Sequence, residues 1–225
     1  MKRVILFLLS VVCLGMETVC GQAVRMRDVF ASMPDSVCPL VTRNNRLDCI
    51  DFIENNMPAQ VKNLVDEPIE LLALTDDYLD FKMSGVSHAE MKLLAMSDTM
   101  HVVCVVKTYA GPLKDSSIRF YDKQWKLLPS VTFKMPDVEA FLGQVPEQEQ
   151  GRKEEVLQML SEMPFIVATL HKDSDNLTLT LQTGELMKKD REWVEPYCKP
   201  VELSLRTLLS GRQMKNMNKH TRQRQ

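Results

Sequence analysis

The sequence predicts an α+β fold in which amino-terminal helices are followed by a mostly antiparallel sheet. Apolar residues between positions 23 and 57 recur every three or four residues, which is typical of amphipathic helices. From about residue 69 onward, short β-like segments are joined by turns of a few residues. A parallel return needs a crossover of a dozen residues or more, so these short links favour antiparallel neighbours.

Two helices are expected before the sheet. The first extends from Val24 to Met33 and stops at Pro34, and the second is capped by Asn44 or Asn45 and ends near Met57. One face of the second helix is apolar and packs, whereas the other face is acidic, with Asp48, Asp51 and Glu54.

Five strands are expected between residues 69 and 121, because each segment has strand length and turn residues separate them. They are Ile69–Leu74, Tyr78–Met83, Glu90–Met96, Met100–Tyr109 and Ser117–Tyr121. Two brief edge strands are predicted at Trp125–Leu128 and Val131–Phe133.

A helical insertion at residues 136–163 divides the predicted sheet into two parts. It starts with Pro136 in a first helical turn, continues through a polar linker from Gly143 to Gly151, and ends with a helix over Lys153–Met163. A hairpin of Phe165–His171 and Leu177–Thr183 follows, because apolar and polar residues alternate there, and a last strand is predicted at Val201–Leu208. We expect the helices to lie on one face of the sheet.

The amino terminus has the pattern of a signal peptide over residues 1–21. Lys2 and Arg3 precede an apolar segment, Val4–Leu14, that is too short to span a bilayer as a helix. Cleavage before Gln22 would give a secreted or periplasmic protein of a Gram-negative envelope, with no transmembrane segment after cleavage. A lipoprotein is the less favoured alternative, because valine precedes both Cys13 and Cys20.

The expected mature chain is a single α+β domain at residues 22–210 followed by a basic, disordered tail at residues 211–225. Residues 22–210 have a formal net charge of −8, and the tail has +5. A mildly acidic body is a poor ligand for nucleic acid, because affinity for phosphate backbones comes from clustered Lys and Arg. Adhesion of the tail to an anionic surface is an alternative use for that segment.

Four cysteines follow the signal peptide: Cys38, Cys49, Cys104 and Cys198. An oxidising compartment permits disulfides, and four cysteines allow three pairings that sequence does not separate. No pair has the spacing of a zinc or redox motif. For Cys104, which lies among valines, a buried free thiol is the alternative.

Recognisable reactive motifs are absent from the sequence. It has only 8 Gly, without a dinucleotide fingerprint or P-loop, and it lacks the Gly-x-Ser-x-Gly and His-Glu-x-x-His patterns. We therefore expect no cofactor and no metal, and we lean against an enzyme. The candidate binding residues are Asp76, Asp77 and Tyr78, because they crowd one turn between two predicted strands and loops often carry function.

Five segments, taken in order, resemble a family of exported proteins of unknown function from Bacteroidales. They are Asn44–Phe52 (NNRLDCIDF), Leu74–Tyr78 (LTDDY), Met91–Leu94 (MKLL), Val102–Thr108 (VVCVVKT) and Ile118–Tyr121 (IRFY). The similarity covers about Met26 to Leu208 and implies an envelope or secreted protein without an assigned activity. It supplies no catalytic residues.

The sequence thus favours an exported, non-enzymatic binding or interaction module whose partner is an unknown envelope protein or glycan. The alternative is a hydrolase that acts on glycans or peptides through carboxylates assembled by the fold. A third hypothesis, a structural component of a cell-surface assembly, predicts a large exposed apolar patch or an unpaired sheet edge.

Overall fold

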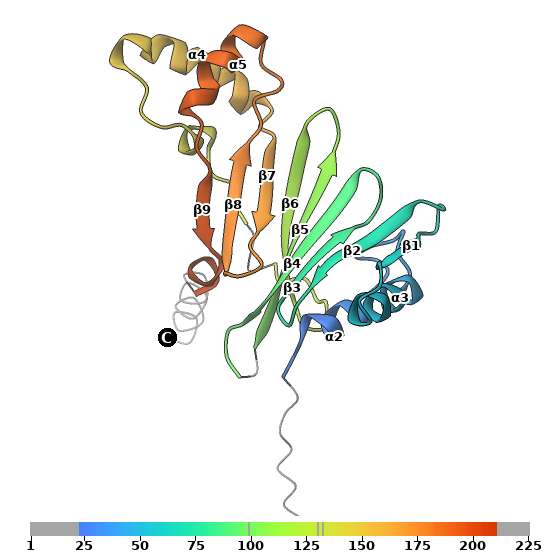
Figure 1. The fold of residues 1–225 in the computed structure, drawn as a ribbon. Coiled ribbons are helices and arrows are strands. Elements are labelled where there is room, and N and C mark those ends of the chain that lie inside the picture. Colours follow the sequence, from blue (N-terminus) through green and yellow to red (C-terminus); the bar gives the residue numbers. More distant parts are fainter. Residues whose placement is uncertain (1–22, 99, 130, 132, 211–225) are drawn as a thin grey trace, which may run out of the picture.

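The computed structural model describes residues 23–98, 100–129, 131 and 133–210, and it contains two antiparallel sheets (Figure 1). The first is a six-stranded meander in chain order, and the second is a three-stranded sheet. The strands are β1 (Gln60–Lys62), β2 (Pro68–Leu74), β3 (Tyr78–Lys82), β4 (Ser87–Ala95), β5 (His101–Ala110), β6 (Lys114–Asp122), β7 (Ile166–Leu170), β8 (Asn176–Leu181) and β9 (Val201–Ser204). The α+β class predicted from the sequence is confirmed.

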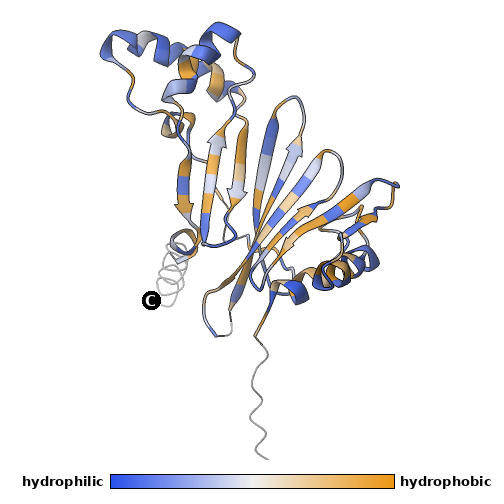
Figure 2. Cartoon of the chain, in the orientation of Figure 1, coloured by the Kyte–Doolittle hydropathy of each residue, from blue (hydrophilic) through white to orange (hydrophobic). Residues whose placement is uncertain are grey.

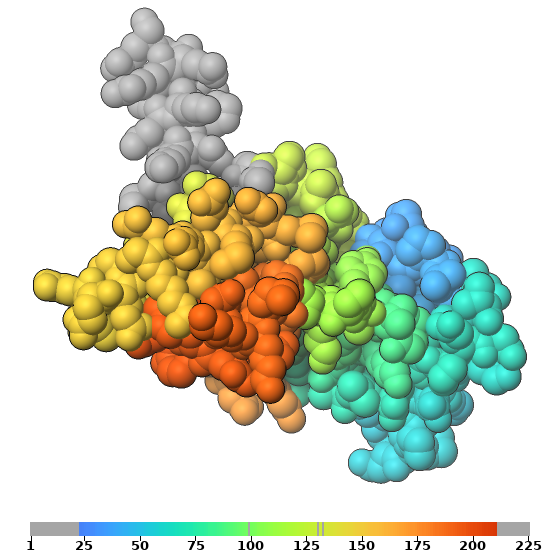
Figure 3. Space-filling view, turned by 90° about the horizontal axis from the view of Figure 1, so that it is seen from above, coloured from blue at the N-terminus to red at the C-terminus, as the bar shows by residue number. Residues whose placement is uncertain are grey.

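The helices form two groups that pack into different hydrophobic cores, so they do not all lie on one face as expected from the sequence (Figure 1). α2 (Met26–Ala31) and α3 (Arg43–Glu54) pack on the six-stranded sheet, whereas α4 (Gln150–Glu162) and α5 (Lys188–Val194) lie beyond one end of the three-stranded sheet. Seen from above, the two halves of the chain lie next to one another (Figure 3). Short 3-10 turns complete the connections at Val138–Phe141, Glu147–Glu149 and Glu195–Tyr197.

The six-stranded sheet is buried on both faces at its centre. On one face, residues such as Met91 and Val105 share a core with Phe30 of α2. On the other face, Cys104 and Val106 share a second core with Leu179 of β8. This explains why hydrophobic residues are concentrated in the strands (Figure 2), and each large apolar side chain buried there contributes about 1.5–3 kcal/mol of transfer free energy.

The free edge of strand β7 is hydrogen-bonded by side chains of the six-stranded sheet. Three of its backbone amides donate to such side chains: Ile166 to Asp115 Oδ1 (3.1 Å), Ala168 to Ser116 Oγ (3.0 Å) and Leu170 to Glu90 Oε2 (3.3 Å). An unpaired strand edge is a template for aggregation. These bonds satisfy the three amides of that edge and join the two sheets.

Side-chain hydrogen bonds fix the amino-terminal helices. Arg46, only 1% exposed, donates to the carbonyl oxygens of Met33 and Val41 and so holds the segment between α2 and α3. The indole Nε1 of Trp125 donates to the carbonyl oxygen of Val29 in α2 at 2.8 Å. Hydrogen bonds that involve a charged group contribute about 1.5–3 kcal/mol each, so Arg46 is a strong anchor.

The start of α3 corrects one prediction. Thr42, not Asn44 or Asn45, is the N-cap, and Asn45 completes a capping box with it. Thr42 accepts a hydrogen bond from the Asn45 backbone N–H, and the Asn45 side chain accepts one from the Thr42 N–H. The helix therefore begins before the asparagines because the hydroxyl of Thr42 satisfies one of its free amides, that of Asn45.

Other boundaries were also wrong in the sequence prediction. Residues 205–210 are helical, so the last strand ends at Ser204 and not at Leu208. The helix of the insertion starts at Gln150, inside the segment expected to be a linker. The segment Trp125–Leu128 is not a strand and forms only an isolated bridge between Leu127 and Tyr121. Neither Val131 nor Phe133 is in a strand.

Two predicted segments, the signal peptide at residues 1–21 and the basic tail at 211–225, lie outside the described residues. Within the described residues, no helix has the length and apolar character needed to span a bilayer.

Candidate functional site

The three candidate binding residues, Asp76, Asp77 and Tyr78, lie at the β2–β3 turn, but their side chains have different surroundings. Asp76 is exposed and lines a pocket beside the helices. Asp77 forms an ion pair with Lys92 of β4, and Tyr78 is buried, with 5% exposure, against the second sheet. The turn therefore connects two separate polar sites.

Local hydrogen bonds define the shape of this turn. Thr75 Oγ1 donates to Asp77 Oδ1 at 3.1 Å and accepts from the Tyr78 backbone N–H at 3.0 Å. The backbone N–H of Met26, the first residue of α2, donates to the Asp76 carbonyl at 2.7 Å. A threonine in a turn satisfies nearby backbone groups in this way, and here the turn also holds the start of α2.

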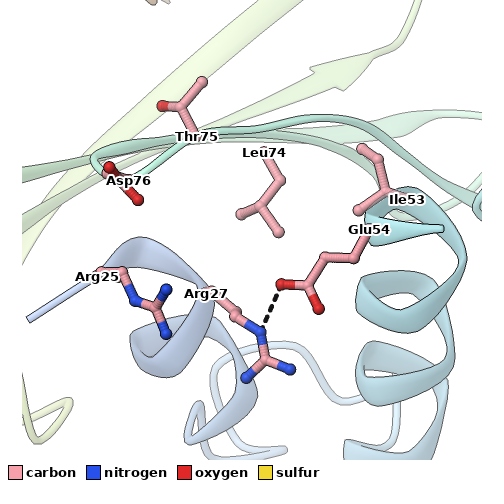
Figure 4. A pocket seen from close by; sticks show the side chains of 7 residues that line it. All are labelled: Arg25, Arg27, Ile53, Glu54, Leu74, Thr75 and Asp76. Carbon is pink, nitrogen blue, oxygen red and sulfur yellow. Dashed lines mark hydrogen bonds and ion pairs between the residues drawn. The ribbon is translucent and has the colours of Figure 1, made fainter. Parts of the chain in front are cut away.

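The pocket beside the turn has a volume of about 400 Å³ and is built from three parts of the chain (Figure 4). The start of α2, the end of α3 and the β2–β3 turn each contribute side chains. The lining residues are Arg25, Arg27, Ile53, Glu54, Leu74, Thr75 and Asp76. Two apolar side chains thus lie among charged groups of both signs.

The two arginines differ in their partners. Arg27 Nε lies 2.5 Å from Glu54 Oε1, and this hydrogen bond raises the pKa of Arg27. Arg25 Nε lies 3.5 Å from the carboxylate of Asp28, which is long for a hydrogen bond. The guanidinium of Arg25 therefore keeps donors for another acceptor.

The carboxylate of Asp76 has no hydrogen bond or ion pair with any other described residue, although its backbone carbonyl is bonded to α2. The pocket therefore contains a paired arginine and carboxylate, Arg27 and Glu54, and two further charges of opposite sign that are not paired with each other.

A second polar site lies in the sheet itself, where three polar residues of β4 alternate with apolar ones. Each has a partner on β3 or the turn before it: His88 with Asp80, Glu90 with Tyr78 (2.8 Å), and Lys92 with Asp77 (2.8 Å). Lys92 Nζ also donates to the carbonyl oxygen of Lys172, just beyond β7, at 2.9 Å. We call these six paired side chains the β3–β4 polar row.

Glu90 is the most buried acid of the polar row, with 7% exposure, and burial raises its pKa. Burial and the charge of Glu90 raise the pKa of Tyr78, and the hydrogen bond to Asp80 raises that of His88. Both oxygens of Glu90 accept hydrogen bonds, from the Tyr78 hydroxyl and from the Leu170 amide. This geometry uses the carboxylate to join the two sheets.

A sequence model of the family described as "Protein of unknown function (DUF3256)" matches residues 18–205. The chain belongs to this family. The resemblance to a family of unknown function is thereby confirmed. No curated protein matches the chain.

The DUF3256 fold also occurs in a solved structure, that of a domain of an uncharacterized protein from Porphyromonas gingivalis W83. The TM-score is 0.65 at 24% sequence identity, and the alignment covers 79% of this chain and 91% of the other. The organism is a member of the Bacteroidales. At this identity the likeness shows a shared fold.

The sequence indicated one residue of the DUF3256 pocket, Asp76, but did not connect it with the other lining residues. Arg25 and Arg27 precede Asp76 by about fifty residues, so no spacing rule links them. Glu54 belongs to the acidic face predicted for the second helix, and the structure pairs it with Arg27. The polar row had a readable signal, because His88, Glu90 and Lys92 recur at every second position of one strand.

The four cysteines that follow the predicted signal peptide are all free thiols in the DUF3256 domain. Cys38, Cys49 and Cys104 are buried, and burial raises the pKa of each, to about 11 for Cys49. Cys198 is half-buried. Among the described residues, no cluster of three or more His, Cys, Asp or Glu could hold a metal ion.

Proposed function

We propose that this protein is an exported, non-enzymatic binding module and that its binding site is the pocket between α2, α3 and the β2–β3 turn. The observation that supports the proposal is the composition of that pocket. Apolar side chains and charged groups of both signs converge there from segments far apart in the sequence, and the carboxylate of Asp76 has no partner among the described residues. Such a site offers both contact area and directional bonds to a small ligand.

The alternative hydrolase would need a carboxyl group that donates a proton to a substrate and a second carboxylate nearby. Glu90 has the raised pKa of such an acid, but its two oxygens already bond to Tyr78 and Leu170. Glu54, in the pocket, is engaged by Arg27. Both arrangements favour binding over proton transfer.

Export is the part of the proposal that rests on the signal-peptide pattern of residues 1–21. Fractionation of a Gram-negative host, followed by amino-terminal sequencing, tests it. We expect the protein in the periplasm or medium with Gln22 as its first residue. Full-length protein retained in the cytoplasm would contradict this part.

Binding can be tested by ¹⁵N chemical-shift mapping against a library of amino acids, short peptides and oligosaccharides. Ligands should shift the amides of Ile53, Glu54 and Thr75. The variant Asp76→Trp should block the pocket from an exposed position, whereas Asp98→Trp, in another exposed turn, should bind like the wild type.

Two outcomes would refute the binding proposal. One is that no compound of the library changes the chemical shifts of the pocket amides. The other is mass spectrometry showing that the protein cleaves the compounds it binds.

A further inference from the structure

The structure points to the charge pattern of the ligand, an inference that rests on the binding function proposed above. We infer that the pocket takes a zwitterionic ligand with an apolar body, of which a short apolar peptide with free ends is the simplest form. Its anionic group would contact Arg25, its cationic group would contact Asp76, and its apolar part would pack on Ile53 and Leu74.

The anionic end is assigned to Arg25 because this arginine is the less engaged of the two in the pocket. The guanidinium of Arg27 is bonded to Glu54 at 2.5 Å, whereas Arg25 is 3.5 Å from its nearest carboxylate. A guanidinium presents five donors in a planar fork that fits a carboxylate with two parallel hydrogen bonds. Arg25 has 49% side-chain exposure and is open to such a partner.

The cationic end is assigned to Asp76. Its carboxylate is exposed at the pocket, and no other described residue bonds to it. Its backbone carbonyl is fixed by the Met26 N–H, so the residue has a defined position at the rim. A primary ammonium group of the ligand could donate to both carboxylate oxygens.

The apolar part of the ligand has a surface to pack on. Figure 4 shows Leu74 between the charged groups of the pocket and Ile53 beside Glu54 on α3. The volume of about 400 Å³ is near the lower end of the 300–1,000 Å³ that is usual for small-molecule sites. This size favours a ligand as small as a dipeptide.

A ligand of a single charge fits the pocket less well. The charged lining consists of two arginines and two acids, with no net formal charge. An anion alone would approach Arg25 but also meet the carboxylate of Asp76, and a cation alone would meet two guanidinium groups. A ligand with both charges gains at each end, and like charges at close range are unfavourable.

The test compares leucyl-leucine with N-acetyl-leucyl-leucine, which lacks the ammonium group, and with leucyl-leucinamide, which lacks the carboxylate. Affinities are measured by titration calorimetry and chemical-shift mapping on the purified protein. Capping either end should weaken binding by about fivefold or more, because a charged hydrogen bond is lost. The same three compounds are then titrated into Arg25→Gln and Asp76→Asn.

Each variant should lose the preference for one charged end of the dipeptide and keep the preference for the other end. Arg25→Gln should bind leucyl-leucine and leucyl-leucinamide equally, and Asp76→Asn should bind leucyl-leucine and N-acetyl-leucyl-leucine equally. Lys188→Gln and Asp66→Asn change exposed charges outside the pocket and should keep both preferences. This pattern separates a contact with the ligand from a general loss of charge.

The inference is overturned if the three compounds bind the wild type equally. It is also overturned if Arg25→Gln keeps the preference for a free carboxylate and Asp76→Asn keeps the preference for a free ammonium group. It also fails, while the proposed function stands, if neutral oligosaccharides shift the pocket amides and the dipeptides do not. If no library compound shifts those amides, the proposed binding function fails as well.

Discussion

The phenolic hydroxyl of Tyr78 on β3 donates a 2.8 Å hydrogen bond to Oε1 of Glu90 on β4, inside the contact between the two sheets. The second oxygen of Glu90 accepts from the Leu170 amide of β7. One buried carboxylate thus joins three strands that belong to both sheets. Loss of these hydrogen bonds, or a change in the protonation of Glu90, should therefore change the stability of the whole fold.

Tyr78→Phe removes the hydroxyl and leaves one oxygen of buried Glu90 without its partner. We expect the free energy of unfolding to fall by about 1–3 kcal/mol, the cost of an unsatisfied buried polar group. Urea denaturation measures this change. Tyr109→Phe is the control, because Tyr109 is 52% exposed, and it should leave stability unchanged. An equal effect of the two substitutions would contradict the role given to Tyr78.

Stability should fall as the pH rises through the pKa values of Glu90 and His88. Burial raises the pKa of Glu90 above its ordinary 4.5, and the bond to Asp80 raises that of His88 above 6.5. The folded protein then holds each proton more tightly than the unfolded chain, so this stabilisation is complete below the ordinary pKa and lost above the folded one. Urea unfolding at several pH values measures the loss.

Two substitutions assign that pH dependence. Glu90→Gln should remove the part that begins near pH 4.5, and His88→Gln the part that begins near pH 6.5, so that each curve is flatter than that of the wild type. The exposed variant Glu202→Gln should follow the wild-type curve. Parallel curves for all four proteins would show that neither group is linked to folding.

For the ion pair of Lys92 and Asp77, removal of the exposed partner should cost more than removal of the buried one. Lys92 is 1% exposed, and Asp77→Ala would leave its ammonium with only the Lys172 carbonyl as an acceptor. Lys92→Met leaves Asp77, which is about half exposed and can be solvated. We expect a loss of about 1–3 kcal/mol for Asp77→Ala and less for Lys92→Met, measured by urea unfolding.

The reverse order for the two variants would show that the attraction between Lys92 and Asp77 outweighs the cost of burying the ammonium group. Lys62→Met serves as the control, since that lysine forms an exposed pair with Asp66 and should contribute little.

The cysteines should react as buried thiols. In the folded protein Cys38, Cys49 and Cys104 should resist iodoacetamide, because they are at most 5% exposed and burial raises their pKa values. Cys198 should react first, and all four should react in denaturant. Peptide mass spectrometry without reductant measures this, and any disulfide-linked peptide pair would contradict the free thiols.

Periodicity and turn residues were sufficient to predict most of the fold. The hairpin of β7 and β8 alternates Leu177, Leu179 and Leu181 with polar residues, and it forms as expected. The three-residue strand β1 was missed because it is too short to show alternation of its own, and its contacts with β2 and α3 are between segments distant in the sequence. The helical turn after Ser204 was missed because Val201, Leu203 and Leu205 alternate with polar residues, which continues a strand pattern past Ser204.

The candidate site was predictable only in part, because a pocket is a property of distant segments. Asp76 drew attention through its acidic neighbours, but Arg25 reaches it only after α2 folds back and the Met26 amide bonds to the turn. The contact between Tyr78 and Glu90 depends on the register of β3 with β4, which places Asp80 opposite Glu90. That register depends on the type of turn between β3 and β4, which residue spacing alone does not give.

The hairpin of β4 and β5 contributes side chains to both hydrophobic cores. A fragment that stopped near residue 135 would leave Val102, Cys104 and Val106 facing water, and a fragment that started there would have no wall for Leu177 and Leu179. The two sheets are therefore unsuited to separate expression. Limited proteolysis between the two sheets should release no stable fragment, because both cores depend on the same hairpin.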